Sequence, residues 1–341
     1  MNTSQPCLQQ TGHIRWIDNM RALTMLMVIY GHIVARPNAF FFLTSPMKMP
    51  GFFAISGYLF HCTDRSFGAL TWNKLKKLAV PYVFLCGLSI VWNLLILWPS
   101  AGMSGFLQML NSVACGTMLW YLPCLLVCEF AFYALVKLCK NRLPLICAGS
   151  VLLLAIGLLI PHEGIVLPWH INALPIVMFF FFLGYAYRQL EQRLTRWEGW
   201  WTLAVLSVVY LALCCAQSRV SGYSIDVNRS VYPDVWISIP SVVVGLAWLC
   251  QLTKLIPMPK WVTWIGQNTL VYYGTHYLTA QTLTLVLRRL GVPEATFFRG
   301  YYLLVQFVVS LVAVAGLALL INRFCPFLVG KKKKRAASQT S

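Results

Sequence analysis

Long hydrophobic stretches separated by short polar segments run through almost the whole chain. A membrane-spanning helix needs about 20 predominantly apolar residues, and ten stretches approach or reach that length. We expect spans at about 20–35, 49–62, 78–98, 117–136, 143–160, 171–187, 199–216, 236–253, 265–287 and 300–321. The second span is short and contains Pro50, Gly51 and Gly57, so we expect it to be tilted or broken.

The composition excludes a water-soluble fold. Hydrophobic residues make up 59% of the 341 residues and charged residues only 11%, whereas soluble domains carry about a quarter charged residues. We therefore predict an all-α integral membrane protein, a bundle of about ten transmembrane helices. The expected divisions are a short cytoplasmic segment (1–19) with no signal-peptide pattern, a transmembrane domain (20–324) and a basic cytoplasmic tail (325–341).

In a soluble protein, the net charge of +18 would indicate binding to nucleic acid. In a membrane protein, the position of the charges along the chain is more informative. Placing both termini in the cytoplasm puts 20 of the 27 Lys and Arg residues on that side, as the positive-inside rule requires. We expect these charges to set the topology and to contact lipid headgroups, above all the run Lys331–Arg335, and we expect no nucleic-acid partner.

Ionisable residues inside the predicted spans are costly and mark candidate functional positions. The first span contains Arg21 and, eleven residues later, His32. Eleven helical steps come within about 20° of three full turns, so both side chains share one helix face about 16 Å apart. Asp18 lies one turn before Arg21 and could pair with it.

Two further polar residues are expected at similar depth, Glu129 in the fourth span and His276 in the ninth. A histidine and a carboxylate facing one space are the usual components of a general base with its orienting partner. The alternative is that they only join helices through hydrogen bonds. The other histidines lie near span ends or in loops and are expected to be solvated: His13, His61, His162 and His170.

Lys74 and Lys77 precede the third span and, three residues apart, share a helix face. They could bind phosphates, or they could be ordinary positive-inside flanking residues. The twelve cysteines show neither a C-x-x-C motif nor zinc-ligand spacing. We expect buried free thiols at the cysteines within apolar stretches, namely Cys86, Cys124, Cys128, Cys147, Cys214, Cys215 and Cys250.

Four of the predicted spans carry characteristic motifs. The first is an Arg followed, after ten residues, by a His, and the second is a Phe-Phe-Ala-Ile-Ser-Gly segment at 52–57. The others are Leu119-Trp120-Tyr121-Leu122 with Glu129, and Gly266-Gln267-Asn268-Thr269 with His276. Together with a weaker match at 182–185, these motifs resemble those of the membrane acyltransferase-3 family, in particular its branch of stand-alone sugar O-acetyltransferases.

The resemblance implies transfer of an acetyl group from acetyl-CoA to a hydroxyl of a cell-envelope glycan or lipid-linked sugar at the bacterial inner membrane. It implies His32 as the general base, with Glu129 or His276 orienting it or the acceptor. Coenzyme binding would fall to Arg21, Lys74, Lys77 and Arg188, and structural or pairing roles to Asp18, Ser56 and Asn268. No metal is implied. The family commonly has Arg-x-x-Arg where this chain has Lys74-x-x-Lys77, and lysine lacks the bidentate fork that suits phosphate.

Other functions remain open at this point. Intramembrane His, Glu and Arg also build proton relays, so the main alternative is a glycan transporter or flippase. A third is an inactive relative that recruits partners. The acceptor, the length of the acyl group, an acyl-histidine intermediate and the oligomeric state, including a homo-oligomer, are likewise open.

Overall fold

The computed structural model describes residues 14–34, 38–61, 67–160, 166–222, 224–293 and 300–329. In this part of the chain the structure is helical, and extended pairing is confined to the isolated bridge between Asp226 and Val231. The first half contains α1 (Arg15–Ile33), α2 (Ala39–Thr44), α3 (Lys48–Tyr58), α4 (Phe67–Ala114), α5 (Tyr121–Leu138) and α6 (Leu143–Leu159). The second half contains η1 (Pro168–Ala173), α7 (Leu174–Leu194), η2 (Thr195–Trp197), α8 (Trp200–Val220), α9 (Val235–Leu255), α10 (Lys260–Gln267), α11 (Thr269–Arg289), α12 (Gly300–Phe324) and η4 (Pro326–Val329).

Each predicted span overlaps one of these helices, although several bounds differ. α1 begins at Arg15, inside the segment predicted as cytoplasmic, and most of the predicted tail (330–341) lies outside the described residues. α3 is short, as the sequence indicated, but it runs unbroken through Pro50, Gly51 and Gly57, so the expected break is not present within it. The ninth predicted span is divided at Asn268 into α10 and α11, and α4 turns at Gly102, whose φ of 57° suits a residue without a side chain.

Six helices in the described part are long and apolar enough to cross a membrane, which makes this a multi-pass membrane protein. The total of about ten spans remains a prediction. α3 is not among the six because it has only 11 residues, whereas α1 and α11 are long enough but too polar. α1 and α11 carry polar site residues, and a helix shielded from lipid by its neighbours does not need an apolar surface on every side.

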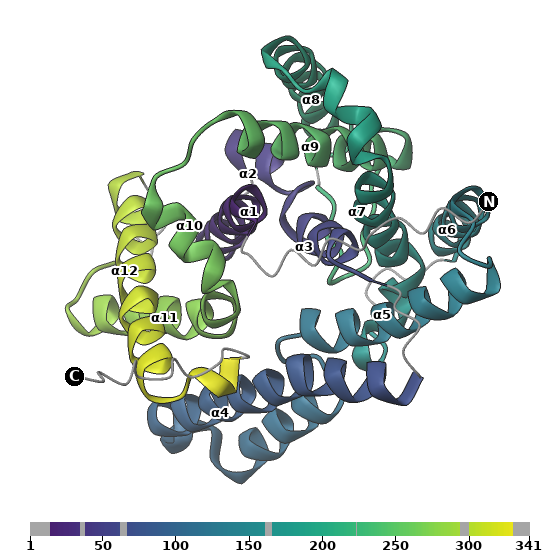
Figure 1. Cartoon of the computed structure of the whole chain (residues 1–341). Helices are drawn as coiled ribbons and strands as arrows, with labels where there is room; N and C mark the ends of the chain where they lie inside the picture. Colours follow the sequence, from purple (N-terminus) through teal and green to yellow (C-terminus); the bar gives the residue numbers. More distant parts are fainter. Residues whose placement is uncertain are drawn as a thin grey trace, which may run out of the picture.

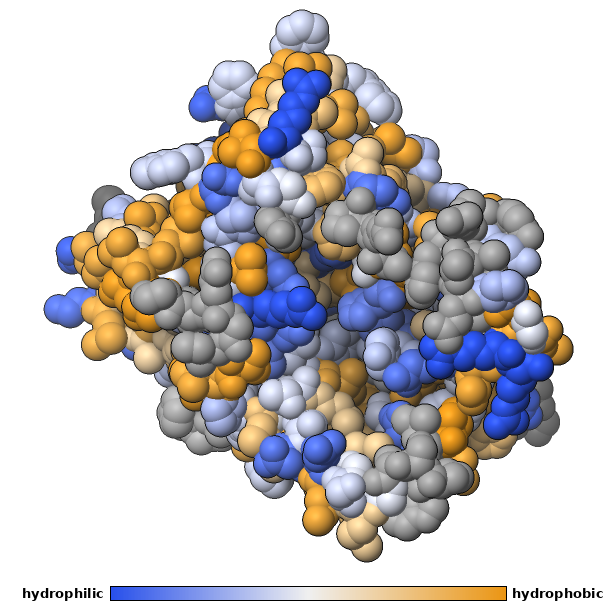
Figure 2. All heavy atoms as spheres, turned by 180° about the vertical axis from the view of Figure 1, so that it is seen from behind, coloured by the Kyte–Doolittle hydropathy of each residue, from blue (hydrophilic) through white to orange (hydrophobic). Residues whose placement is uncertain are grey.

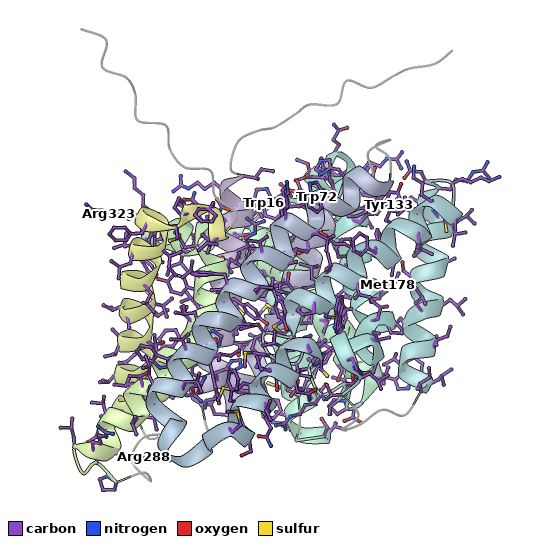
Figure 3. All side chains as sticks on the ribbon, turned by 90° about the horizontal axis from the view of Figure 1, so that it is seen from below. Trp16, Trp72, Tyr133, Met178, Arg288 and Arg323 are labelled. Carbon is purple, nitrogen blue, oxygen red and sulfur yellow. The ribbon has the colours of Figure 1, made fainter. Side chains whose placement is uncertain are left out.

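Figure 1 shows that α1 and α3 lie in the middle of the molecule, where other long helices surround them, so α1 can carry polar residues. Figure 3 shows Trp16, Trp72 and Arg323 at one face, which we call the Trp16 face, and Arg288 at the opposite Arg288 face. The start of α1 and the end of α12 therefore lie at the same face. That agrees with an even number of crossings, while the assignment of the Trp16 face to the cytoplasm remains a prediction.

Close contacts between helix backbones fix the central helices. α3 crosses α7 so closely that a Cβ added at Gly57 would lie 1.8 Å from the Phe181 carbonyl oxygen. A Cβ at Gly184 would lie 1.7 Å from the oxygen of Ala54, on the other side of the same crossing. The two glycines thus allow the short α3 to bury its length against a full-length helix, as small residues do in membrane bundles.

A half-buried ion-pair network joins the ends of α3, α7 and α9. The Lys254 ammonium lies 2.8 Å from Glu191 Oε1 and 2.6 Å from Glu198 Oε1. The Tyr58 hydroxyl donates a 2.6 Å hydrogen bond to the other oxygen of Glu191. Because one cation bonds both carboxylates and one of them bonds α3, the network holds the C-terminal end of α3 in place.

The cysteines in apolar stretches are free thiols, as expected. Five of them are buried, namely Cys86, Cys124, Cys128, Cys214 and Cys250. Cys147 is half-buried, and Cys215 is exposed, which differs from the expectation of burial. Cys215 lies on α8, which Figure 1 shows at the periphery, so a side chain there can face outward instead of toward the bundle.

Candidate active site

Two histidines from helices far apart in sequence pack together. His32 lies near the C-terminal end of α1 and His276 in α11, and these two helices are in contact. The ring centroids are 4.9 Å apart, with an angle of 78° between the ring planes. His276 is buried, whereas His32 is exposed. The accessible imidazole of His32 therefore packs against the buried imidazole of His276.

Backbone carbonyls fix which nitrogen of each ring carries hydrogen. Nδ1 of His32 lies 2.8 Å from the Val28 oxygen, and Nδ1 of His276 lies 2.9 Å from the oxygens of both Tyr272 and Tyr273. Because a carbonyl only accepts, each Nδ1 donates, and each neutral ring keeps its lone pair on Nε2. Nε2 of His276 is buried and has no hydrogen-bond partner among the described residues. Nε2 of His32 is thus the accessible basic nitrogen.

His32 lines a cavity of about 830 Å³, which we call the His32 cavity. Its walls come from α1, the segment from Phe41 to Pro50, Trp120 and residues of the segment 224–233. Since α1 starts at the Trp16 face, its His32 end points toward the Arg288 face. Figure 2 shows hydrophilic side chains gathered around the middle of that face, in agreement with the polar lining of the cavity.

A second, smaller cavity of about 220 Å³ is lined by Arg21 and Ser56; we call it the Arg21 cavity. Arg21 pairs with Asp18 at 3.3 Å, as the sequence predicted. The Gln267 amide donates a 3.2 Å hydrogen bond to the other oxygen of Asp18 and also lines the cavity. The Ser56 hydroxyl lies 3.1 Å from that of Tyr121. The Arg21 cavity therefore combines one cation with several neutral polar groups.

The two cavities share no lining residue, but residues that are neighbours in the sequence line one cavity or the other. Trp120 lines the His32 cavity, and the next residue, Tyr121, lines the Arg21 cavity. On α3, Pro50 faces the first cavity and Phe52 the second. The Tyr121 amide donates a 3.0 Å hydrogen bond to the Tyr273 hydroxyl, which ties α5 to α11 between the two cavities. A group passing between the cavities would have to cross this aromatic layer.

Comparison with known proteins identifies the family. The family model for an acyltransferase domain, Acyl_transf_3, matches residues 14–323 and thus includes both cavities and both histidines. The chain belongs to the membrane acyltransferase-3 family. Comparisons of this acyltransferase with curated proteins and with solved structures give no match. Within the described residues the acyltransferase has no group of three or more His, Cys, Asp or Glu side chains that could hold a metal ion.

The structure does not join Glu129 of the acyltransferase to the histidine pair by a hydrogen bond. Glu129 is buried on α5, with 7% of its surface exposed. The described hydrogen bonds of His32 and His276 go only to backbone carbonyls. Asn268 lies between α10 and α11: its amide donates a 2.7 Å hydrogen bond to the Trp264 oxygen, and its own oxygen accepts a 2.6 Å hydrogen bond from Asn322.

Two other predicted coenzyme ligands, Lys77 and Arg188, are not among the lining residues of the Arg21 cavity. Lys77 is exposed on α4, one residue before Leu78, which lines the cavity. The Lys74 side chain lies outside the described part. Arg188 donates a 3.1 Å hydrogen bond to the Tyr58 oxygen, at the end of α3. Lys77 is thus adjacent in sequence to a residue of the cavity lining, whereas Arg188 bonds the C-terminal end of α3.

One expectation about the other histidines was wrong. His170 is buried, not solvated: its ring lies 4.9 Å from that of Trp120, and its Nε2 lies 2.7 Å from Asn228 Oδ1. The segment around Asn228 folds back over η1, which sequence position alone could not indicate. His61 is exposed as expected, while His13 and His162 lie outside the described residues.

Two parts of the His32 cavity were not predicted from the sequence, Lys48 and the segment 224–233. Lys48 directly precedes the second predicted span (49–62) and lies only a few residues before the Phe-Phe-Ala-Ile-Ser-Gly motif, so its position next to that motif was an available signal. The segment 224–233 is a polar connection between two spans and carries no motif that could have identified it.

Proposed function

We propose that this acyltransferase transfers an acetyl group from acetyl-CoA to a hydroxyl of a cell-envelope glycan or a lipid-linked sugar, with His32 as the general base. The observation that carries the proposal is the accessible Nε2 of His32 in a polar cavity, on the same helix as Arg21 in a separate cavity. The family membership supports acyl transfer and lends no support to a glycan transporter. A bacterial inner membrane is the expected location.

The proposed step requires only proton transfer and substitution at the thioester. Nε2 of His32 takes the proton of the acceptor hydroxyl while the hydroxyl oxygen bonds to the thioester carbonyl carbon. The carbon–sulfur bond then breaks, and the coenzyme thiolate leaves and takes up a proton. A thioester is already activated, so the reaction needs no further source of energy.

We propose that His276 positions His32. The edge-on contact of the two rings and the two backbone bonds of His276 restrict the direction in which the His32 ring can turn. Glu129 is a candidate for positioning the acceptor or the helices, because its carboxylate is buried in α5 without a bond to either ring.

Coenzyme A is polyanionic, and the Trp16 face offers the cations that would hold it. Arg21 lines a cavity there and Lys77 is exposed beside it, so both suit the phosphates, together with Lys74 and Arg188. α1 separates Arg21 from His32 by about 16 Å, which the long, flexible arm of the coenzyme would have to bridge. In this arrangement the thioester arrives from one face of the membrane and the hydroxyl from the other.

Incubation of the purified full chain with radiolabelled acetyl-CoA and an envelope-glycan extract tests the proposal. We expect label to enter the glycan in a reaction that requires His32 and survives loss of the buried thiol in Cys124→Ala. Movement of glycan across vesicles in the absence of acetyl-CoA, together with no transfer of label, would show that the protein is a transporter instead.

Removing both Lys74 and Lys77 should weaken coenzyme binding more than it slows the chemical step. We expect Lys74→Ala/Lys77→Ala to raise KM for acetyl-CoA by roughly tenfold, because each lost phosphate contact contributes about 1 kcal/mol or less near water. The measurement is kcat and the KM of each substrate, with the other substrate at a saturating concentration. The pair Lys137→Ala/Lys140→Ala has the same spacing and exposed side chains and is the matched control. A change confined to the KM of the acceptor would contradict the proposed role.

Deletion of residues 331–341 should leave turnover unchanged. The deleted residues include the run Lys331–Arg335, which we interpret as an anchor to anionic headgroups and a determinant of topology, not as part of the site. Turnover per correctly inserted molecule in membrane vesicles is the relevant measurement. Loss of turnover in molecules with normal topology would assign the tail a catalytic or binding role.

A further inference from the structure

Lys48 places an ammonium group in the His32 cavity. It is the first residue of α3, is half-buried, and lines the cavity together with His32. Its Nζ lies over the ring of Phe41, 4.1 Å from the ring centroid. The stem packs across Gly31, the residue before His32: a Cβ added at Gly31 would lie 2.9 Å from Nζ. Lys48 is therefore held beside the proposed base by an aromatic ring and a glycine.

In the described part of the chain this ammonium has neither a hydrogen bond nor an ion pair with protein. A lysine has three N–H donors, and the cation–π contact with Phe41 satisfies none of them through an oxygen. Removing a cation from bulk water costs free energy unless it is paired. The donors are thus available to a ligand in the cavity.

The acidic group of the cavity does not neutralise Lys48 by direct contact. Oδ1 of Asp226 accepts hydrogen bonds from the backbone amides of Asn228 and Arg229, at 3.0 and 3.3 Å. Its Oδ2 lies 3.9 Å from Nε of Arg229. Asp226 and Arg229 therefore pair with each other. The charged residues of the described lining are Lys48, Asp226 and Arg229, so the cavity keeps a net charge of +1. Asp226 attracts Lys48 across the cavity without a hydrogen bond to it.

We propose that Lys48 binds an oxyanion of the acceptor, a carboxylate or a phosphate carried by the sugar, and so selects anionic sugars for the His32 cavity. The inference rests on the proposed function in taking this cavity as the acceptor site. The anion would lie beside Gly31, one residue from the base, so its binding would hold a neighbouring hydroxyl of the same sugar near Nε2 of His32. Phosphate and carboxylate share the chemistry of charged oxygens that accept from an ammonium.

Calorimetric titration of the full chain in phosphatidylcholine nanodiscs, without acyl donor, tests this inference. The ligands are glucose 1-phosphate, glucuronate and glucose, so that the first two distinguish phosphate from carboxylate and the third lacks both. A hydrogen bond to a charged group contributes about 1.5–3 kcal/mol. We therefore expect at least one anionic sugar to bind with a Kd roughly 10- to 100-fold below that of glucose.

Three variants locate the effect. Lys48→Met keeps an apolar stem and should raise the Kd of the anionic sugar to that of glucose, whereas Lys48→Arg should retain the preference. Gly31→Ala leaves the charge but displaces Nζ, and should weaken binding of the anionic sugar alone. Lys137→Met, at an exposed lysine on α5, should change nothing. Elution volume and thermal midpoint, compared with the unmodified chain, establish that each variant is folded.

Equal Kd values for all three sugars, no measurable binding of either anionic sugar, or an undiminished preference in folded Lys48→Met would each overturn the inference. These results do not depend on acyl transfer, because no acyl donor is present. Conversely, His32-dependent transfer by a protein without anion preference would leave the proposed function standing and remove only the role of Lys48.

Discussion

The variant His32→Ala is expected to lose acyl transfer almost completely, with kcat lowered by about 1,000-fold. General acid–base catalysis by a positioned side chain contributes roughly 10²–10⁴-fold, and the described polar contacts of this ring leave Nε2 as its accessible base. His276 cannot replace it, because the His276 ring is buried and bonded to two carbonyls. The loss should therefore appear in kcat at saturating concentrations of both substrates.

The fold should survive this change. His32 is exposed, and its one described hydrogen bond, to the Val28 oxygen, contributes about 1 kcal/mol to stability. Amounts of folded protein in the membrane should match those of the unmodified chain and of the control Cys124→Ala, which should retain transfer. If His32→Ala turned over at the normal rate, the base would have to be another residue.

The second large effect is expected on stability, at the α3–α7 crossing. Gly57→Ala would place a Cβ 1.8 Å from the Phe181 carbonyl oxygen, a backbone atom that cannot move without the helix. The helices must separate, which loosens the packing around the central α3. Overpacking costs up to about 3 kcal/mol, and we expect the thermal midpoint to fall by roughly 10 °C. Gly184→Ala should act similarly, because its Cβ would meet the Ala54 oxygen.

Two other helical glycines are matched controls. A Cβ at Gly87 in α4 or Gly316 in α12 has no neighbour within 4 Å, so Gly87→Ala and Gly316→Ala should be neutral or slightly stabilising. The thermal midpoint in detergent, followed by size-exclusion chromatography, measures all four variants. If Gly57→Ala were as stable as Gly87→Ala, the close crossing of α3 and α7 would not exist in the membrane.

The Phe-Phe-Ala-Ile-Ser-Gly segment thus combines two roles within a few residues. Ser56 lines the Arg21 cavity and lies 3.1 Å from the Tyr121 hydroxyl. Gly57, the next residue, lies against the backbone of α7, and its missing side chain allows the close contact. The motif therefore contributes both to the candidate site and to helix packing. Some substitutions within it should reduce acyl transfer, and others should reduce stability.

The sequence determined the features that depend on one helix at a time. Hydrophobic stretches predicted the helices, because a segment in lipid must satisfy its own backbone hydrogen bonds, and an α-helix does so. Helical periodicity also predicted the Asp18–Arg21 pair, and the structure confirms it at 3.3 Å. It placed Arg21 and His32 on one face, and the uninterrupted α1 carries both.

Only the tertiary structure decided which helices share a site. It brought His276 to His32 and kept Glu129 from bonding either ring, although the sequence offered both as partners. It also buried His170 beneath the segment 224–233 and directed Lys48 into the His32 cavity. The physical reason is that hydrophobicity fixes where a helix starts and ends, whereas its neighbours and its rotation depend on side-chain packing and on close glycine contacts between segments far apart in the chain.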